Sequence, residues 1–456
     1  MNVATALISK WQIRLSRLSA GLSRAYQTHG LTGAIRKTWL AVRTRGPRGA
    51  MMRVVSSLRQ HAASGLGHVQ LNAFDAHYQA LSPIADRPAP RPPRSPMIVI
   101  ISDTTIPQCY RYRIENKLEY FRAQGVGVCF ADANQPNEVI SALQFASGVI
   151  FYRSMMDDAF MFYHGEAERL GLPTFYDIDD PMFDQGLIAQ NANTEALEPA
   201  IQSALYRDAV SIRRAMASCD ALLASTPDLA SRMNAASGGK PAFVWRNVAD
   251  QAALDLGDRL AREAANDQST SLKIGYFSGS LAHEADFDIA APALERLLAS
   301  RDDVELLLFG HLGPRPMFDA LSDRVTRHAV ADYEPYLRAV AACDLVVVPL
   351  VDNGFNRCKS VVRFLDAALV QTPVMASMVG DYANLVRNDE TGWLVTDDGW
   401  DHALARACLN AAGRHDIAQR ARHFVETAYA VGSYAPALDA EHQNLLFGQP
   451  YASVGH

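Results

Sequence analysis

The sequence has few cysteines, no long apolar run and no glycine-rich dinucleotide motif. Its six cysteines form no CxxC pair and follow no disulfide-like spacing, which favours a reducing compartment and argues against a structural zinc site. No window approaches the roughly 18 consecutive apolar residues that a membrane-spanning helix requires. The lack of a GxGxxG motif argues against a dehydrogenase. With 456 residues, 49% apolar and 20% charged, the chain has the composition of a globular protein of two or more domains.

Acidic residues are also missing from the beginning of the chain. No Asp or Glu precedes Asp75; residues 1–95 carry 14 Lys and Arg against two acids, and the remaining residues carry 29 bases against 47 acids. Such asymmetry is typical of a tail with an electrostatic partner of its own. An apolar helical stripe runs through this tail with cations beside it: Leu7, Trp11, Leu15, Leu18 and Leu22, flanked by Lys10, Arg14, Arg17 and Arg24.

A basic amphipathic helix of this kind suits an anionic membrane surface. Three alternatives stay open: a helix that docks on the acidic remainder of the chain, a disordered arm, and a transit peptide. We expect the protein to be cytoplasmic, with peripheral contact to the inner face of the membrane through residues 1–60. The charge pattern gives no reason to expect a nucleic-acid partner.

A proline-rich stretch divides the chain. Five prolines within residues 87–96 predict a linker of polyproline character. The predicted organisation is a basic amphipathic helical extension, this linker, a first Rossmann-like domain, an interdomain linker, a second Rossmann-like domain, and a C-terminal helix and tail: residues 1–86, 87–96, 97–250, 251–270, 271–430 and 431–456.

Short apolar runs alternate with stretches of helical length in both domains. The first domain contains MIVIIS, GVCFAD, GVIFYR, PTFYDIDD, ALLAST and PAFVWRN, and the second contains LKIGYFSG, VELLLFG, LVVVPL, PVMAS and GWLV. Continuous apolar strands that alternate with helices indicate parallel sheets covered on both faces. We therefore expect an α/β protein with two Rossmann-like domains facing a cleft, whose ligands bind beyond the carboxyl ends of the strands.

The stretch FNRCKSVVRFLDAALVQTPVMAS, which begins at Phe355, carries two cations and an acid after such a strand. A helix that begins near Ser360 would have Ser360 as its cap and Lys359 at the positive end of its dipole. Arg363 lies one turn further along and Asp366 another turn deeper. The cations suit a diphosphate, and the acid suits paired ribose hydroxyls. The alternative is an Arg363–Asp366 surface ion pair, which would contribute only tenths of a kcal/mol.

A second strand end offers a turn of small residues. Gly279 and Ser280 follow the strand LKIGYFS, and their backbone N–H groups can approach a phosphate closely. Most such turns merely connect two elements. His283 comes next and is a candidate catalytic residue, although a lone histidine is more often a structural hydrogen-bonding partner.

The first domain supplies candidates for binding an acceptor. Arg111 and Arg113 follow its first strand, Arg153 ends GVIFYR, and Asp179 and Asp180 end PTFYDIDD. Carboxylates at a cleft can hold sugar hydroxyls or act as a base. The aspartates could instead form a turn before a proline, where Asp is common. The DxD pattern could also hold a metal ion, but we expect no metal here.

Taken in order, these motifs resemble the C-terminal half of a glycosyltransferase of the GT-B fold, and more narrowly the family 4 (group 1) enzymes of bacterial polysaccharide assembly. The similarity covers most of residues 271–430, and CYRYRIENKLEYF, FYDIDDPMFD and CDALLASTPDLASRM in the first domain extend it. The resemblance implies that Ser280, Lys359, Arg363 and Asp366 hold a nucleotide-sugar. The family commonly has a Glu eight residues before the acid that matches Asp366, whereas this chain has Cys358.

The resemblance implies a hexosyltransferase that moves a sugar from a nucleotide-sugar to a saccharide or lipid-linked acceptor in cell-surface polysaccharide assembly. It also implies retention of configuration, no metal and no cofactor. Lys359, Arg363 and His283 are the catalytic candidates, and Gly279 and Ser360 complete the donor site. Two alternatives stay open: a sugar-nucleotide 2-epimerase of the same fold, and an inactive GT-B scaffold, which Cys358 and the basic tail would favour.

Overall fold

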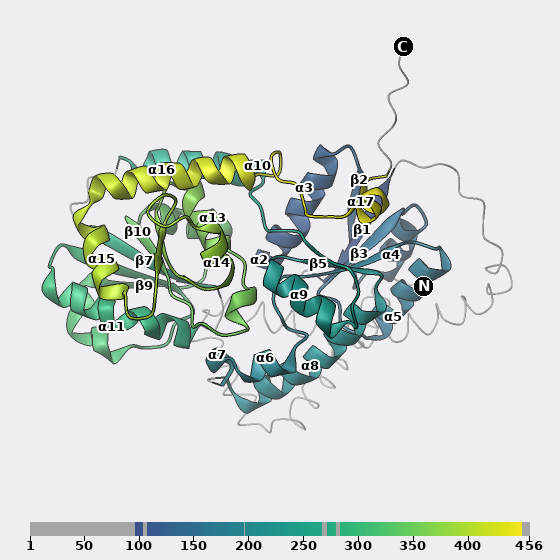
Figure 1. Cartoon of the computed structure of the whole chain (residues 1–456), viewed down its shortest axis with the longest axis horizontal. Helices are drawn as coiled ribbons and strands as arrows, with labels where there is room; N and C mark the ends of the chain where they lie inside the picture. Colours follow the sequence, from purple (N-terminus) through teal and green to yellow (C-terminus); the bar gives the residue numbers. More distant parts are fainter. Residues whose placement is uncertain (1–95, 104–106, 196, 267–270, 280–282, 449–456) are drawn as a thin grey trace, which may run out of the picture. The chain divides into compact units, whose positions relative to one another are not determined.

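A computed structural model describes residues 96–103, 107–195, 197–266, 271–279 and 283–448. The predicted basic extension, almost all of the proline-rich linker and Ser280 lie outside these residues. The described chain forms two lobes, each built on one parallel sheet and its helices (Figure 1). We call residues 96–248 with 431–448 the first lobe, and residues 249–430 the second lobe.

The sheet of the first lobe has six parallel strands in the order β2-β1-β3-β4-β5-β6. The strands are β1 Met97–Ser102, β2 Gly127–Asp132, β3 Gly148–Tyr152, β4 Thr174–Ile178, β5 Ala221–Ala224 and β6 Ala242–Val244. The helices are α2 Pro107–Cys109, the π-helix η1 Tyr110–Glu115, α3 Asn116–Ala123, α4 Pro136–Leu143, α5 Asp158–Arg169, α6 Gln185–Ala189, α7 Ala192–Glu195, α8 Pro199–Ser218, α9 Pro227–Ala236 and the C-terminal α17 Ala440–Phe447.

The sheet of the second lobe has six parallel strands in the order β12-β11-β10-β7-β8-β9. The strands are β7 Leu272–Ser278, β8 Val304–Gly310, β9 Val325–His328, β10 Leu345–Val348, β11 Val374–Ser377 and β12 Trp393–Val395. The helices are α10 Gln251–Ala264, α11 Glu284–Ser300, the 3-10 helix η2 Pro316–Arg324, α12 Tyr333–Ala341, the 3-10 helix η3 Asn356–Cys358, α13 Val362–Leu369, α14 Gly380–Leu385, α15 Trp400–Leu409 and α16 Ala411–Ala428.

Each sheet is covered on both faces, because successive side chains of a strand point to opposite sides. In β1, Val99 and Ile101 join one buried cluster, whereas Ile98 and Ile100 join another. The strand β10 divides in the same way between two clusters of the second lobe. Eleven strands coincide with the predicted apolar runs, so the predicted pair of Rossmann-like domains is confirmed.

The strand β9 was not predicted. Its sequence is VTRH, and three of its four residues are exposed at the edge of the sheet. An exposed edge strand buries little apolar surface, so no apolar run identifies it.

The predicted interdomain linker and the C-terminal segment each pack against one of the lobes. Residues 251–270, predicted as an interdomain linker, contain the helix α10, whose Ala253 and Leu260 belong to a buried cluster of the second lobe. The C-terminal segment returns to the first lobe, where Leu446 of α17 packs in the same cluster as Trp245.

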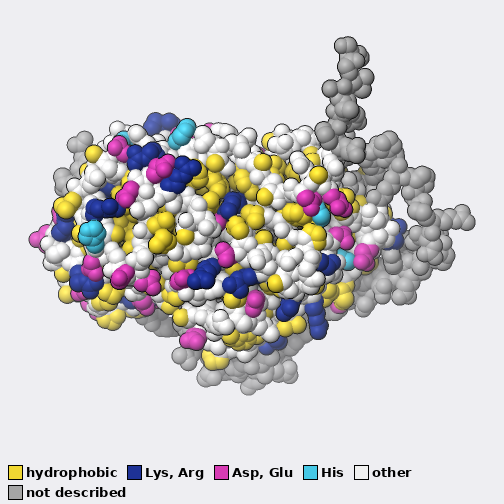
Figure 2. Space-filling view, in the orientation of Figure 1, with side chains coloured by type: hydrophobic (Ala, Val, Ile, Leu, Met, Phe, Trp, Pro, Cys, Tyr) yellow, Lys and Arg dark blue, Asp and Glu magenta, His cyan; other side chains and the backbone are white. Residues whose placement is uncertain are grey.

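Cations and acids of the described residues are interspersed on the face drawn in Figure 2. Among the described residues, no helix combines the length and the apolar character needed to cross a bilayer.

Candidate functional site

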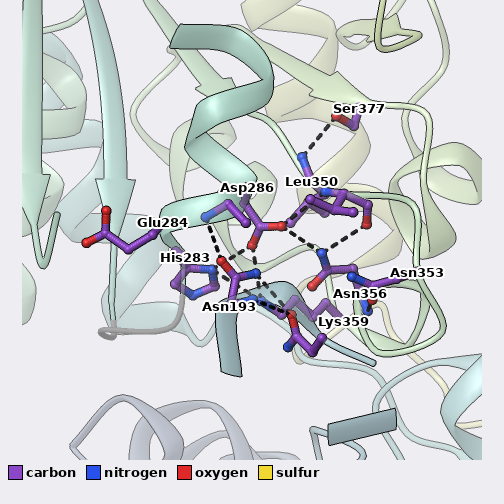
Figure 3. Close-up of polar contacts among 12 residues, drawn as sticks. Asn193, His283, Glu284, Asp286, Leu350, Asn353, Asn356, Lys359 and Ser377 are labelled. Carbon is purple, nitrogen blue, oxygen red and sulfur yellow. Dashed lines mark hydrogen bonds and ion pairs between the residues drawn. The ribbon is translucent and has the colours of Figure 1, made fainter. Parts of the chain in front are cut away.

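The carboxylate of Asp286 organises the carboxyl edge of the second sheet. It is fully buried in the first turn of α11, where one oxygen accepts hydrogen bonds from the Val351 backbone N–H at 3.0 Å and from Asn356 at 2.7 Å. The other oxygen lies 3.0 Å from Nδ1 of His283 (Figure 3). Burial alone would raise the pKa of Asp286, but the bond from His283 and the charge of Lys359 outweigh burial and hold this pKa below its usual value. A permanent buried anion thus joins the loops that follow β7 and β10.

Lys359 and Arg363 lie beside this anion. The ammonium nitrogen of Lys359 is 3.8 Å from Asp286, and its side chain is only 14% exposed. Burial lowers the pKa of Lys359. In Arg363, Nη2 lies 3.4 Å from Nε2 of His283, whereas Nη1 is buried and has no hydrogen-bond partner among the described residues. A buried, unpaired guanidinium nitrogen is costly, so this pair of cations is suited to receive an anion.

His283 connects the anion to Arg363 as a neutral ring. Burial, followed by the charge of Lys359, lowers the pKa of His283 to about 3. Nδ1 lies 3.0 Å from Asp286 and 3.2 Å from the ammonium nitrogen of Lys359. The ionised Asp286 requires a donor, so we assign the proton to Nδ1; the ring then accepts no bond from Lys359, and Nε2 is an acceptor facing Arg363. This assignment makes His283 a positioning group in the resting site, because its Nδ1 proton is already donated to Asp286.

The N-terminus of α11 receives a contact from the first lobe. Asn193, in the short helix α7, accepts a hydrogen bond from the backbone N–H of Ala285 at 2.9 Å (Figure 3). Asn193 is 1% exposed, so this contact is buried. No sequence signal pointed to Asn193, since it does not follow a strand. Gly279 faces the first lobe as well, because a Cβ added there would come within 3.2 Å of the Gln108 side chain.

Asp366 lies on α13, three residues after Arg363, and is 3% exposed. Its two oxygens accept hydrogen bonds from three tyrosine hydroxyls, those of Tyr112, Tyr333 and Tyr336, at distances between 2.6 and 3.1 Å. Burial raises the pKa of Asp366 to about 6 against the effect of these donors. The acid predicted for a ribose is therefore accessible to a ligand only if a tyrosine moves.

Arg153 gathers the two predicted carboxylates at the edge of the first sheet. Its Nε lies 2.9 Å from Asp179 and its Nη2 lies 2.9 Å from Asp180. Tyr152 also donates to Asp179 at 3.0 Å. Arg153 has a φ of 51°, a left-handed conformation that a residue other than glycine seldom adopts and that is often found at functional sites. Burial and the neighbouring charge of Asp179 raise the pKa of Asp180, whereas the charges of Arg153 and Lys359 oppose this rise, so Asp180 lies within electrostatic reach of Lys359 in the second lobe.

Two predicted acceptor residues lie elsewhere. Arg113 is fully buried, where it pairs with Asp177 and donates to Asn247. Its predicted contact with an acceptor is therefore wrong, since its donors are used inside the first lobe. Arg111 is bound to Asp250 at 3.1 Å and stacks on Tyr333, with 3.8 Å between its guanidinium carbon and the ring centre. Arg111 thus lies on the side of Asp366 and not with Arg153.

One prediction about the segment that begins at Phe355 also needs correction. The helix α13 begins at Val362, and Ser360 does not cap it: its hydroxyl accepts a hydrogen bond from Asn247 of the first lobe at 2.9 Å. Cys358 packs in a buried cluster of the first lobe, and its carbonyl accepts a bond from Thr226. Burial raises the pKa of Cys358 to about 12, so this thiol is neutral and inert.

Metal ligands were not predicted, and the carboxylates have other partners. Asp179 and Asp180 pair with Arg153, and Asp177 pairs with Arg113 and Lys117. Within the ranges that the structure describes, no group of three or more His, Cys, Asp or Glu side chains is arranged to hold a metal. A cavity of about 410 Å³ lies away from all these groups, lined by Arg246, Arg387, Phe424, Tyr434 and their neighbours.

Comparison with known proteins supports the fold and gives a family for part of the chain. Residues 273–413 match the family model described as Glycosyl transferases group 1. No curated protein matches the chain in sequence. The match thus covers the described strands of the second sheet and the residues around Asp286, Lys359 and Arg363.

Three solved structures share the fold over 74% of this chain. Anabaena Alr3699/HepE in complex with UDP and glucose has a TM-score of 0.51 at 15% identity, over 96% of its own chain. The sucrose-phosphate synthase of Thermosynechococcus elongatus has a TM-score of 0.50 at 17% identity, and a glycosyltransferase of Rickettsia africae has 0.50 at 10% identity, each over 95% of its own chain. At these identities the likeness establishes the GT-B fold.

Proposed function

We propose, with the group 1 glycosyl transferase match of residues 273–413 as the premise, that this protein is a glycosyltransferase. It moves a hexose from a nucleotide-sugar donor to a saccharide or lipid-linked acceptor. The reaction proceeds with retention of configuration and without a metal ion or cofactor. The product belongs to cell-surface polysaccharide assembly. Residues 1–60 bring the cytoplasmic enzyme to an anionic membrane surface, where lipid-linked acceptors are found.

One observation carries this proposal: two half-buried cations meet at the carboxyl edge of the second sheet, and one of them has a buried donor without a partner among the described residues. Lys359 and Arg363 stand beside the N-terminus of α11, and Nη1 of Arg363 has no partner among the described residues. A diphosphate placed here would satisfy that donor and gain from the positive end of the helix dipole. The permanent charge of Asp286 holds the cations in place while the site is empty.

The same cations supply the catalytic effect. As the bond between sugar and diphosphate breaks, negative charge develops on the leaving phosphate oxygens. Lys359 and Arg363 stabilise that charge without reorganisation, because Asp286 and His283 already orient them. They also do the electrostatic work for which other enzymes use a divalent cation. The departing phosphate takes the proton of the acceptor hydroxyl, so no protein base is needed. The acceptor oxygen forms the new bond to the sugar on the face that the phosphate leaves, so configuration is retained without a protein nucleophile.

The acceptor binds on the side of the first lobe, where Arg153 holds Asp179 and Asp180. The side chain of Asp180 is 36% exposed, so its carboxylate can accept a hydrogen bond from a sugar hydroxyl. The charge of Lys359 acts on Asp180, so we place that hydroxyl on the side of the donor cations. Asp180 would then orient the acceptor, while the cations of the second lobe hold the donor.

The proposal is tested by donor binding followed by transfer. Thermal unfolding is measured with UDP-, GDP-, ADP- and dTDP-sugars, because a ligand that binds only the folded protein raises the unfolding temperature, and the rise grows with the logarithm of ligand concentration relative to Kd. UDP-glucose is the first donor to try, since the Anabaena structure of the same fold was solved with UDP and glucose. Release of nucleoside diphosphate that depends on an added saccharide or lipid-linked acceptor supports transfer. If none of the donors raises the unfolding temperature, the proposal is overturned.

A 2-epimerase is the second candidate, favoured by the buried pair of His283 and Asp286. The product mixture separates the two activities. An epimerase converts the donor without an acceptor and yields an epimeric sugar, whereas a transferase needs the acceptor and yields a glycoside.

A further inference from the structure

The surroundings of Asp366 come from both lobes. Tyr333 and Tyr336 belong to α12 of the second lobe, whereas Tyr112 belongs to η1 of the first. The Tyr112 hydroxyl lies 2.7 Å from one carboxylate oxygen and 2.6 Å from the other. A single hydroxyl thus sits between two acceptors, in the place where a pair of neighbouring sugar hydroxyls would donate one bond to each oxygen.

The neighbouring residue of the first lobe covers an aromatic face. The guanidinium carbon of Arg111 lies 3.8 Å from the centre of the Tyr333 ring. Asp250 holds this guanidinium in place, with both of its oxygens 3.1 Å from Nη2. A planar cation stacked on an aromatic ring occupies the kind of surface on which a nucleobase stacks. Arg111 and Tyr112 therefore fill two adjacent positions, one that suits a base and one that suits a sugar diol.

These positions continue directly from the proposed phosphate site. Arg363 and Asp366 lie three residues apart on α13, so their side chains share one face of that helix. Tyr336 adjoins both, since it donates to Asp366 and its pKa is also affected by the charge of Arg363. The void left beside Arg111, Tyr112 and Asp366 is only about 10 Å³, room for about one water. No nucleoside fits there until the two side chains leave.

The segment that carries them is fixed to the first lobe. It is a π-helix, an element often found at functional sites. Arg113, within the same helix, donates to Asp177, to the Trp245 carbonyl and to Asn247, all inside the first lobe. Because Arg113 is locked, Arg111 and Tyr112 leave the second lobe only when the first lobe moves away as a whole.

We propose that Arg111 and Tyr112 occupy the nucleoside subsite of the donor in the closed, donor-free enzyme. The nucleoside replaces both when the lobes separate, with its ribose hydroxyls on Asp366 and its base on Tyr333. This inference rests on the proposed function, since it assumes a nucleotide-sugar donor. Arg111 and Tyr112 thereby compete with the nucleotide for the same subsite. A substitution that weakens their contacts with the second lobe should therefore make nucleotide binding tighter.

The test is the affinity of variants for UDP, GDP, ADP, dTDP and inorganic pyrophosphate, measured by calorimetry at pH 8, where Asp366 is ionised. Tyr112→Phe removes the hydroxyl and keeps the ring. We expect the best-bound nucleotide to bind about tenfold more tightly, because one hydrogen bond to a charged group no longer has to be broken. Pyrophosphate, which has no nucleoside, should bind with unchanged affinity. Asp366→Asn should weaken nucleotide binding and leave pyrophosphate unaffected.

Tyr110→Phe is the matched control, since Tyr110 lies in the same π-helix but packs edge-on against Phe130. It should bind every probe like the wild type. Unchanged or weaker nucleotide binding by Tyr112→Phe would overturn the inference and leave the proposed function standing. Equal tightening for pyrophosphate would also overturn it, because Tyr112 would then be a general latch between the lobes. Failure of every protein to bind any nucleotide would overturn the proposed function, and this inference with it.

Discussion

The ammonium nitrogen of Lys359 lies 3.8 Å from the buried carboxylate of Asp286. Burial is expensive for both charges, and at 3.8 Å the carboxylate is too far away for a hydrogen bond to the ammonium, which lies 3.2 Å from Nδ1 of His283. This arrangement keeps a positive charge ready for an incoming anion. It also connects the segments that follow β7 and β10, because Asp286 lies in the first and Lys359 in the second.

Replacing Lys359 by Ala should slow transfer about 100- to 1,000-fold, the usual cost of removing one preorganised donor to a developing charge. Stability should change little, since Asp286 keeps its bonds from Val351, Asn356 and His283. Steady-state rates with saturating donor are the measurement. Arg357→Ala, in the same loop but 51% exposed and paired with Asp352, is the control and should retain wild-type rates.

Replacing His283 by Asn should remove part of the acid sensitivity of the fold. The pKa of His283 is about 3 in the folded protein against an ordinary value of 6.5. The unfolded chain therefore binds a proton below pH 6.5 that the folded site refuses, and stability is lost as the pH falls from 6.5 towards 3. At 1.36 kcal/mol per unit, the wild type should lose about 2 kcal/mol relative to His283→Asn between pH 8 and pH 5. Urea unfolding of both proteins at the two pH values measures this difference. If the free energy of unfolding falls equally in the two proteins between pH 8 and pH 5, the assignment of a neutral histidine is contradicted.

Replacing Asp180 by Asn should raise the KM for the acceptor about tenfold, because a carboxylate bond to a hydroxyl is stronger than an amide bond by roughly one factor of ten in affinity. Donor affinity should stay within twofold, since Asp180 lies in the first lobe and pairs with Arg153. Separate titrations of donor and acceptor distinguish the two. If only donor binding changes, Asp180 contacts the donor and not the acceptor.

Replacing Arg113 by Ala should destabilise the protein by about 3–5 kcal/mol, because it breaks a buried ion pair and leaves Asp177 with one partner fewer. Arg111→Ala, two residues earlier and 19% exposed, should cost less, about 1–2 kcal/mol, because it removes a partly exposed ion pair and one cation–π contact. The midpoints of denaturant unfolding compare the two. Similar losses would mean that Arg113 is not the buried anchor of the π-helix.

Much of the fold was predictable because its signals are local. Apolar runs such as MIVIIS and LVVVPL are buried on both faces wherever the chain folds into a parallel sheet, so the sequence alone places the strands β1 and β10. Lys359 and Arg363 were predictable too, since they follow a strand that ends at the ligand-binding edge of such a sheet. The strand β9 was not, because its exposed residues carry no apolar pattern.

The sequence by itself determined two α/β lobes and a cationic segment after a strand of the second one. Tertiary structure alone decided which polar groups meet: Arg113 with Asp177, Asn193 with the N-terminus of α11, and Tyr112 with Asp366. These partners are 64, 92 and 254 residues apart along the chain. Local propensity and periodicity act over a few residues, whereas the pairing of distant buried polar groups depends on how whole lobes pack, and no short pattern encodes it.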